Sequence, residues 1–146
     1  MKSWILVVAA CVVGGLSPLQ GSLNAQMGQL LGHPLKGALV NFSVGGILLC
    51  AILALFVGFP NREALGEAPW YLYTAGVIGL LFVTTLLALI PVIGALRVVT
   101  ALVVGQLIMS AVIDHFGILN VPVVSLGMNR IAGMMLLMTG LYLIQR

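Results

Sequence analysis

Long apolar runs with almost no charge constrain this chain more than any other feature. Of its 146 residues, 62% are hydrophobic and only 6% are charged, whereas a soluble domain usually carries about 25% charged residues. So few charges cannot cover a surface that faces water, which makes a lipid bilayer the expected solvent. The runs are continuous and do not alternate between apolar and polar residues. This pattern predicts membrane helices and excludes the strands of a membrane barrel.

Five apolar segments are each long enough to cross about 30 Å of hydrocarbon as a helix. They cover residues 4–31, 35–59, 70–93, 98–116 and 128–144. The sequence therefore predicts one all-α transmembrane domain over residues 1–146, with its termini on opposite sides of the membrane. The N-terminal run resembles a signal peptide, but its charged region is the single Lys2. We therefore take that run as the first membrane helix.

Glycine and proline mark the predicted ends of the first three spans. These ends are Gly32-His33-Pro34, Gly58 with Pro60, and Pro91 with Gly94. The connection over residues 61–69 holds Arg62, Glu63 and Glu67, so it is expected to be a loop in water. Trp70 begins the third span, where aromatic side chains commonly sit at the membrane–water interface.

Lysine and arginine are divided evenly between the two sides that five spans predict. One side holds Lys2, Arg62 and Arg130, and the other holds Lys36, Arg97 and Arg146. A bias in these residues normally orients a membrane protein, and none exists here. Either the chain inserts in both orientations and pairs with an inverted copy, or the tie is a coincidence of small numbers and the first helix alone sets the orientation.

The most polar stretch inside the spans covers residues 14–28 of the first predicted helix. At about 100° per residue, the small and amide residues that share one face within about 60° of Ser17 are Gly14, Gln20, Gly21, Asn24 and Gly28. Gln26 falls on the opposite face. Unpaired amides in hydrocarbon cost several kcal/mol, so this face either packs against another helix or lines a path for a polar solute. Pro18, with Gly21 beside it, is the predicted hinge of this helix.

Two amides in other spans are candidates for the same path. Asn41 lies in the second span, where it could meet the first-helix amides or cap a local turn. Gln106 lies at mid-depth in the fourth span. We therefore predict that the substrate-binding residues are Ser17, Gln20, Asn24, Asn41 and Gln106.

The remaining candidates are ionisable residues and glycines near the C-terminus. Asp114 and His115, near the end of the fourth span, form with Arg130 either an interfacial ion pair or a gate and proton site. Gly133 and Gly140 lie two turns apart on the fifth helix, so they either form a dimer seam or pack within one subunit.

Other classes of function lack their residue patterns. We find no Ser-His-Asp set, zinc-ligand spacing or phosphate loop, so we expect no enzyme, metal or cofactor. Positive charges are spread singly, which gives no patch for nucleic acid. Cys11 and Cys50 lie in apolar runs and are expected to be packing residues.

Three groups of residues resemble the YdcZ-like five-helix family of the drug/metabolite transporter (DMT) superfamily. They are Gly14-Gly15-x-x-Pro18-x-Gln20-Gly21-x-x-Asn24, Val104-x-Gln106-Leu107 with Asp114-His115-Phe116-Gly117, and Arg130-x-x-Gly133 with Gly140-x-Tyr142-Leu143. The resemblance covers essentially the whole chain and implies a bacterial inner-membrane transporter of small molecules. Relatives occur as short chains, as gene pairs and as fused ten-helix forms with inverted halves, which implies an antiparallel dimer.

The expected function is export of a small polar or amphipathic solute by alternating access in an inverted dimer, either of one chain or of the chain and a paired homologue. The small multidrug exporters of the same superfamily bind cations and protons at a first-helix glutamate, and residues 4–31 hold no carboxylate here. A polar solute therefore suits this helix better than a free cation. The alternatives are a small dual-topology ion channel and a helical partner subunit that transports nothing.

Overall fold

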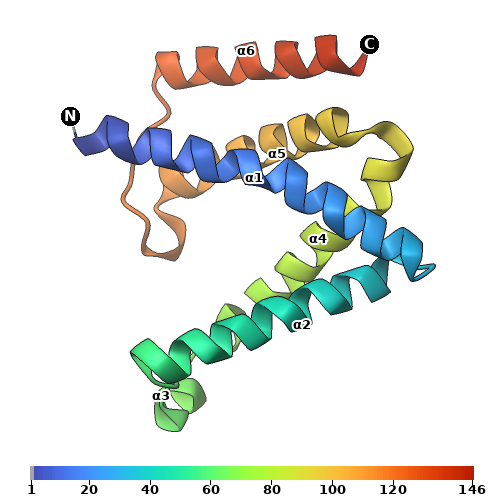
Figure 1. Ribbon diagram of the computed structural model, residues 1–146. Helices are drawn as coiled ribbons and strands as arrows, with labels where there is room; N and C mark the ends of the chain where they lie inside the picture. Colours follow the sequence, from blue (N-terminus) through green and yellow to red (C-terminus); the bar gives the residue numbers. More distant parts are fainter. Residues whose placement is uncertain (1) are drawn as a thin grey trace. The chain divides into compact units, whose positions relative to one another are not determined.

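The computed structural model describes residues 2–146, and over these residues it is built of helices without a strand (Figure 1). Four helices are long and apolar enough to cross a membrane, namely Trp4–Leu30, Pro34–Val57, Trp70–Ile93 and Ala95–Phe116. They follow the first four predicted spans closely, which confirms the all-helical membrane class. The fifth segment is also a helix, of 18 residues, but its crossing of the membrane stays a prediction.

The helices form two compact units, one ending at Val92 and the other covering Ile93–Arg146. The first unit consists of α1 (Lys2–Leu30), α2 (Pro34–Ile52), the π-helix η1 (Leu53–Val57), α3 (Arg62–Glu67), the 3-10 helix η2 (Trp70–Tyr73) and α4 (Thr74–Ile93). The second consists of α5 (Ala95–Phe116), the 3-10 helix η3 (Ile118–Asn120) and α6 (Met128–Gln145).

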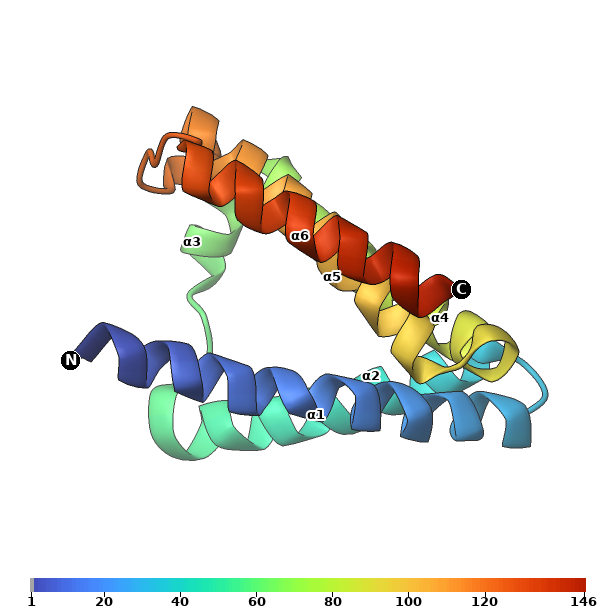
Figure 2. The ribbon, with the colours of Figure 1, turned by 90° about the horizontal axis from the view of Figure 1, so that it is seen from above.

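A tight turn joins α1 to α2, which run in opposite directions (Figure 2) and diverge with distance from the turn (Figure 1). Gly32 has a φ of +74°, which reverses the chain at a conformation that glycine adopts without strain. The Gly32 N–H donates to the Gln29 carbonyl at 3.1 Å, and the His33 N–H donates to the Gly28 carbonyl at 3.0 Å. This pair of bonds is the Schellman motif, which closes the end of a helix.

The same turn begins α2. The His33 side chain caps the helix, because its Nδ1 accepts a hydrogen bond from the Leu35 N–H at 3.1 Å. Pro34 follows at the first helical position, where its missing N–H costs nothing. The predicted end of the first span at Gly32-His33-Pro34 is therefore confirmed, together with its physical cause.

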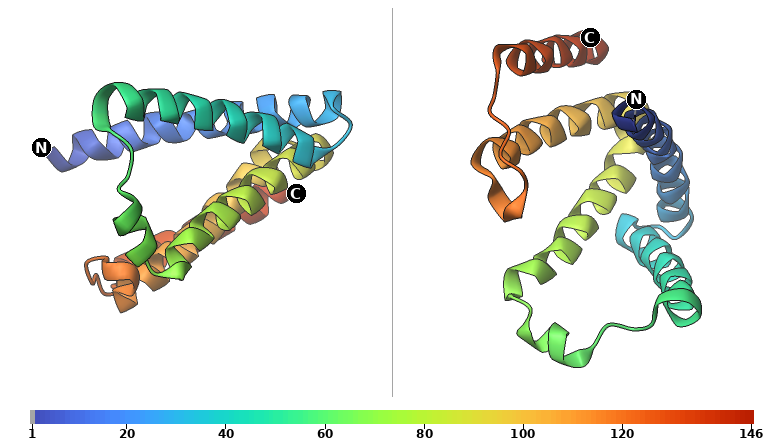
Figure 3. Two further views of the ribbon diagram at one scale, coloured as in Figure 1. Left: turned by 90° about the horizontal axis from the view of Figure 1, so that it is seen from below. Right: turned by 90° about the vertical axis from the view of Figure 1, so that its left-hand side faces the viewer.

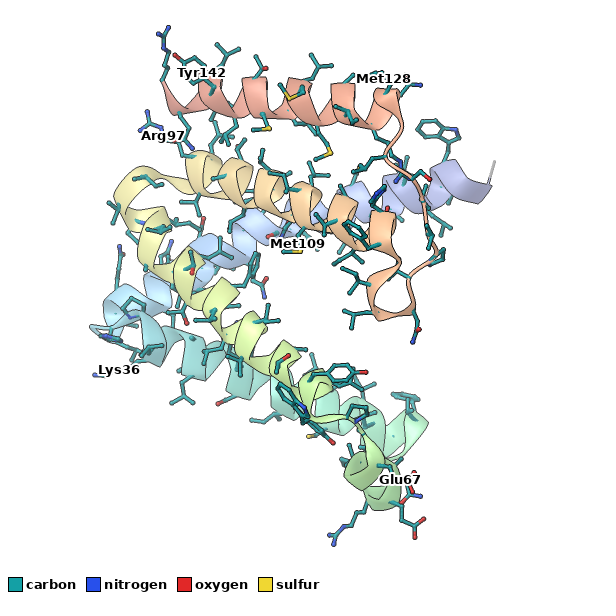
Figure 4. All side chains as sticks on the ribbon, turned by 180° about the vertical axis from the view of Figure 1, so that it is seen from behind. Lys36, Glu67, Arg97, Met109, Met128 and Tyr142 are labelled. Atoms are coloured by element: carbon teal, nitrogen blue, oxygen red, sulfur yellow. The ribbon has the colours of Figure 1, made fainter. Side chains whose placement is uncertain are left out.

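The connection from α2 to α4 contains a short helix where the sequence predicted a loop. After η1 the chain turns at Gly58, whose φ is +89°. Asn61 then caps α3 by accepting a hydrogen bond from the Glu63 N–H at 3.0 Å. The Tyr73 hydroxyl donates to the Leu65 carbonyl at 2.6 Å and ties α3 to the start of the next span. Figure 3 shows α3 between α2 and α4, and Glu67 extends from it in Figure 4.

The end of α4 differs from the prediction in one respect. Pro91 lies inside this helix, which continues to Ile93, so Pro91 does not terminate it. A proline removes one backbone donor, and a membrane helix tolerates that loss where neighbouring groups compensate. Gly94, with a φ of +86°, makes the turn into α5, so it alone ends the third span.

The second unit is an antiparallel pair, α5 and α6 (Figure 1). Gly117 ends α5 in the left-handed conformation, with its N–H bonded to the Ile113 carbonyl. Leu119 and Asn120 in η3 also have positive φ angles, both 61°. The Val124 N–H then donates to the Asp114 carbonyl at 2.8 Å, which folds the connection back onto the end of α5.

Candidate substrate groove

The first unit is held together where α1 meets α2 and α4. A Cβ atom placed on Gly37 of α2 would lie 2.7 Å from the Gly28 backbone nitrogen and 2.8 Å from Cδ2 of Leu87. A Cβ on Gly21 would lie 2.8 Å from Cδ1 of Ile90 in α4. Glycine thus allows the helices to approach closely, and this approach fixes how α1 presents the residues between its glycines.

Beside this contact, α1 and α2 line an open groove of about 660 Å³. Four amides line it, Asn24, Gln26, Gln29 and Asn41, together with the apolar or small residues Leu23, Met27, Leu30, Gly37, Val40 and Val44. Pockets of a few hundred cubic ångströms that combine apolar walls with a few polar groups commonly bind small molecules. None of these ten residues carries a charge.

Asn24 is the most informative residue of the groove. It is only 8% exposed and is the one polar residue in the buried core among residues 4–146. Within that part of the chain no hydrogen bond joins the Asn24 or Asn41 side chain to another residue. Both amides therefore keep unused donors and acceptors at the wall of the groove.

The structure brings together two of the five predicted substrate-binding residues. Asn24 and Asn41 line one groove from two helices, whereas Ser17 and Gln20 do not line it. Ser17 is half-buried and Gln20 is exposed, and both lie further along α1 from the turn. Gln106 is exposed on α5 in the second unit.

Reasoning from the sequence missed Gln26 and Gln29. A wheel drawn for α1 alone places Gln26 opposite Asn24, yet the groove is wide enough to include both. The useful signal would have been proximity to the turn, because three amides lie in the last seven residues of α1 and a fourth lies in α2. Gln26 thus lines the groove although it lies outside the predicted polar face of α1.

The predicted hinge residues have clear surroundings. Helix α1 remains continuous through Pro18, whose carbonyl accepts a hydrogen bond from the Ser22 hydroxyl at 2.9 Å. Gly21 is buried against Leu86 and Ile90 of α4, so it has a packing role in this structure. Bending at these two positions stays a prediction.

In the second unit, Asp114 and Arg130 meet across the hairpin. The Arg130 Nη1 lies 3.2 Å from Oδ2 of Asp114, with the side chains 45% and 34% exposed. Asp114 is in the last turn of α5 and Arg130 in the first turn of α6, so each charge opposes the dipole of its own helix and is compensated by the other. His115 instead stacks edge-on against Phe116, with ring centroids 4.8 Å apart.

The ion pair borders a second groove, of about 300 Å³, between α5 and α6. Ser110 and Gly133 line it together with Asp114 and Arg130. A Cβ atom added to Gly133 or Gly140 would meet nothing within 4 Å. The two glycines of the predicted seam therefore leave room on α6, and packing against α5 within the second unit does not fill it.

One comparison with known proteins gives a match. A family model described as "Putative inner membrane exporter, YdcZ" matches residues 5–143. No curated protein and no solved structure matches the chain. The family match confirms the resemblance inferred from the motifs in the first, fourth and fifth helices.

Proposed function

We propose that this chain, which belongs to the YdcZ family of inner-membrane exporters, exports a small polar or amphipathic solute by alternating access. Its long apolar helices and its family make it a multi-pass inner-membrane protein. The observation that carries the proposal is Asn24, which is only 8% exposed and lines the groove with a side-chain amide that bonds to no other described residue. Such a group is costly against lipid chains, so a polar occupant of the groove stabilises it.

Contacts at both ends of α6 support a fifth span. One end is held by the Arg130–Asp114 pair at 3.2 Å, and at the other the Gln145 Nε2 donates to the Arg97 carbonyl at 3.2 Å. Arg97 and Tyr142 lie at the same end of this hairpin in Figure 4. Because α5 is long enough to cross the bilayer, the attachment of α6 to both of its ends supports the proposal that α6 crosses with it.

Five spans lead to the inverted dimer. An odd number of spans, combined with three lysine or arginine residues on each side, gives the chain no electrostatic preference for one orientation. Gly133, at the edge of the α5–α6 groove, and Gly140 leave space beside α6 and are the proposed seam for the second copy. Two inverted copies place equivalent grooves toward opposite sides, which is the symmetry that alternating access requires.

The test is efflux from proteoliposomes loaded with a mixture of neutral, cationic and anionic solutes, with the retained solutes measured by mass spectrometry. We expect the wild type to release a subset of them and Asn24→Ala and Asn41→Ala to lower that release at least tenfold. Asn129→Ala is the matched control, because Asn129 is an exposed amide of α6 outside the groove.

Two other results would contradict the proposal. Unitary ionic currents in planar bilayers would indicate a channel. Absence of any efflux, together with weaker subunit association in Asn24→Ala, would indicate a partner subunit whose amides serve only assembly.

A further inference from the structure

We infer that the α1–α2 groove selects uncharged solutes that carry both a hydrogen-bond donor and an acceptor on an apolar body. This inference rests on the proposed function, since it concerns the substrate class of the same groove. It is carried by three properties of the groove: its lack of charge, the chemistry of its four amides and its depth.

The first property concerns the charge of the solute. All ten lining residues are uncharged, and the Asp114–Arg130 ion pair lies in the other unit. Removing an ion from water costs several kcal/mol in a protein interior unless an opposite charge compensates it. The groove offers no such charge, whereas an uncharged solute has no comparable cost.

The second property is the chemistry of the amides. Each amide offers an N–H₂ donor and a carbonyl acceptor, so Asn24, Asn41 and the two glutamines present both kinds of group. A cation would use only the oxygens and an anion only the N–H groups, which leaves the remaining groups of the buried Asn24 unpaired. A carboxamide, hydroxyl or carbamate satisfies both kinds at once.

The third property is depth and wall composition. Asn24 lies six residues before the end of α1, and Asn41 lies seven residues after the start of α2, which places both about 10 Å from the turn at 1.5 Å per residue. The wall between them is mainly apolar, with Leu23, Met27 and Val44 among its residues. A solute there rests inside the hydrocarbon depth and exchanges apolar surface with these side chains.

The test uses three probes that share one aromatic body and differ in charge, namely 2-naphthamide, 2-naphthylmethylammonium and 2-naphthoate. Thermal shifts of the purified full chain in detergent report binding. We expect 2-naphthamide to bind at least tenfold more tightly than either ion. Asn24→Asp adds a carboxylate to the groove, so it should reverse the preference toward 2-naphthylmethylammonium.

Asn129→Asp is the matched control, because it makes the same change from amide to carboxylate at an exposed position of α6 outside the groove. It should leave the preference unaltered. Comparison between variants in one detergent also cancels partition of the probes into micelles. Equal binding of the ions by the wild type, abolished by Asn41→Ala, would overturn the substrate class and leave the transport proposal standing. If Asn24→Asp kept the wild-type preference among the three probes, or if 2-naphthamide gave the wild type no thermal shift, the inference would be overturned. The efflux experiment would still test the proposed transport independently.

Discussion

At Gly37 a single methyl group decides how α1 and α2 pack. The nearest atoms to a Cβ at this position are the Gly28 nitrogen at 2.7 Å, Cδ2 of Leu87 at 2.8 Å and the Gly28 Cα at 2.9 Å. The Gly28 backbone cannot rotate away as the Leu87 side chain can, so the helices themselves must separate. Gly37 also lines the groove.

The first prediction follows from this contact. Gly37→Ala should destabilise the protein by about 1–3 kcal/mol, the usual cost of overpacking a well-packed site, and thermal unfolding in detergent would measure it as a lower Tm. Gly45→Ala is the control on the same helix, because a Cβ there meets nothing within 4 Å. Equal melting temperatures for the two variants would refute the close approach.

At the scale of elements, the α1–α2 hairpin depends on a histidine used as a helix cap. His33 is an uncommon residue at this position, where asparagine, aspartate and serine are preferred. Its Nδ1 accepts the Leu35 N–H at 3.1 Å, so the ring must carry its proton on Nε2 when the cap is formed. The cap holds the end of α2 that bears Gly37 and Asn41.

We therefore predict that His33→Ala lowers the unfolding free energy by about 1 kcal/mol, a typical loss for an N-cap. His33→Asn supplies another side-chain acceptor and should retain most of the stability. Chemical unfolding followed by circular dichroism would compare the two. An equal loss in both variants would show that histidine contributes something other than the cap.

The α5–α6 hairpin contains a weaker interaction, the ion pair between Asp114 and Arg130. Its ion pair is partly exposed, and exposed pairs are worth only about 0–1 kcal/mol. The pair instead helps to position α6. Asp114 also accepts a hydrogen bond from the Val124 N–H through its backbone carbonyl at 2.8 Å. Together these contacts register the start of α6 against the end of α5.

At the scale of the whole molecule, cysteine labelling tests the orientation of the chain in the membrane. In a background with Cys11→Ser and Cys50→Ser, we expect Gln145→Cys to react with a membrane-impermeant reagent from both faces, in roughly equal parts, if one gene product inserts both ways. Gly66→Cys should behave in the same way, and neither variant changes the even division of lysine and arginine. Labelling of Gln145→Cys from one face alone would exclude dual insertion and leave a separately encoded inverted partner as the source of symmetry.

Much of the fold was predictable because hydropathy is a local property. The first four spans follow from runs of apolar residues that no tertiary contact needs to specify, and Gly32 and Gly94 end helices through their own backbone freedom. Pro91 was misjudged because its effect depends on whether neighbours compensate a lost hydrogen bond. The short helix α3 depends on the Asn61 cap and the Tyr73 contact. The polarity of residues 61–69 alone does not reveal either interaction.

The sequence by itself determined the solvent, the helical class and the family, since each rests on residue types and their order along the chain. It also identified Asn24 and Asn41 as amides that need partners. Only the tertiary structure decided which amides share a groove, because that depends on how closely Gly28 and Gly37 allow two helices to approach. The groove therefore includes Gln26 and Gln29 and leaves out Ser17 and Gln20. The sequence of α1 alone does not reveal this division, because two helices form the groove.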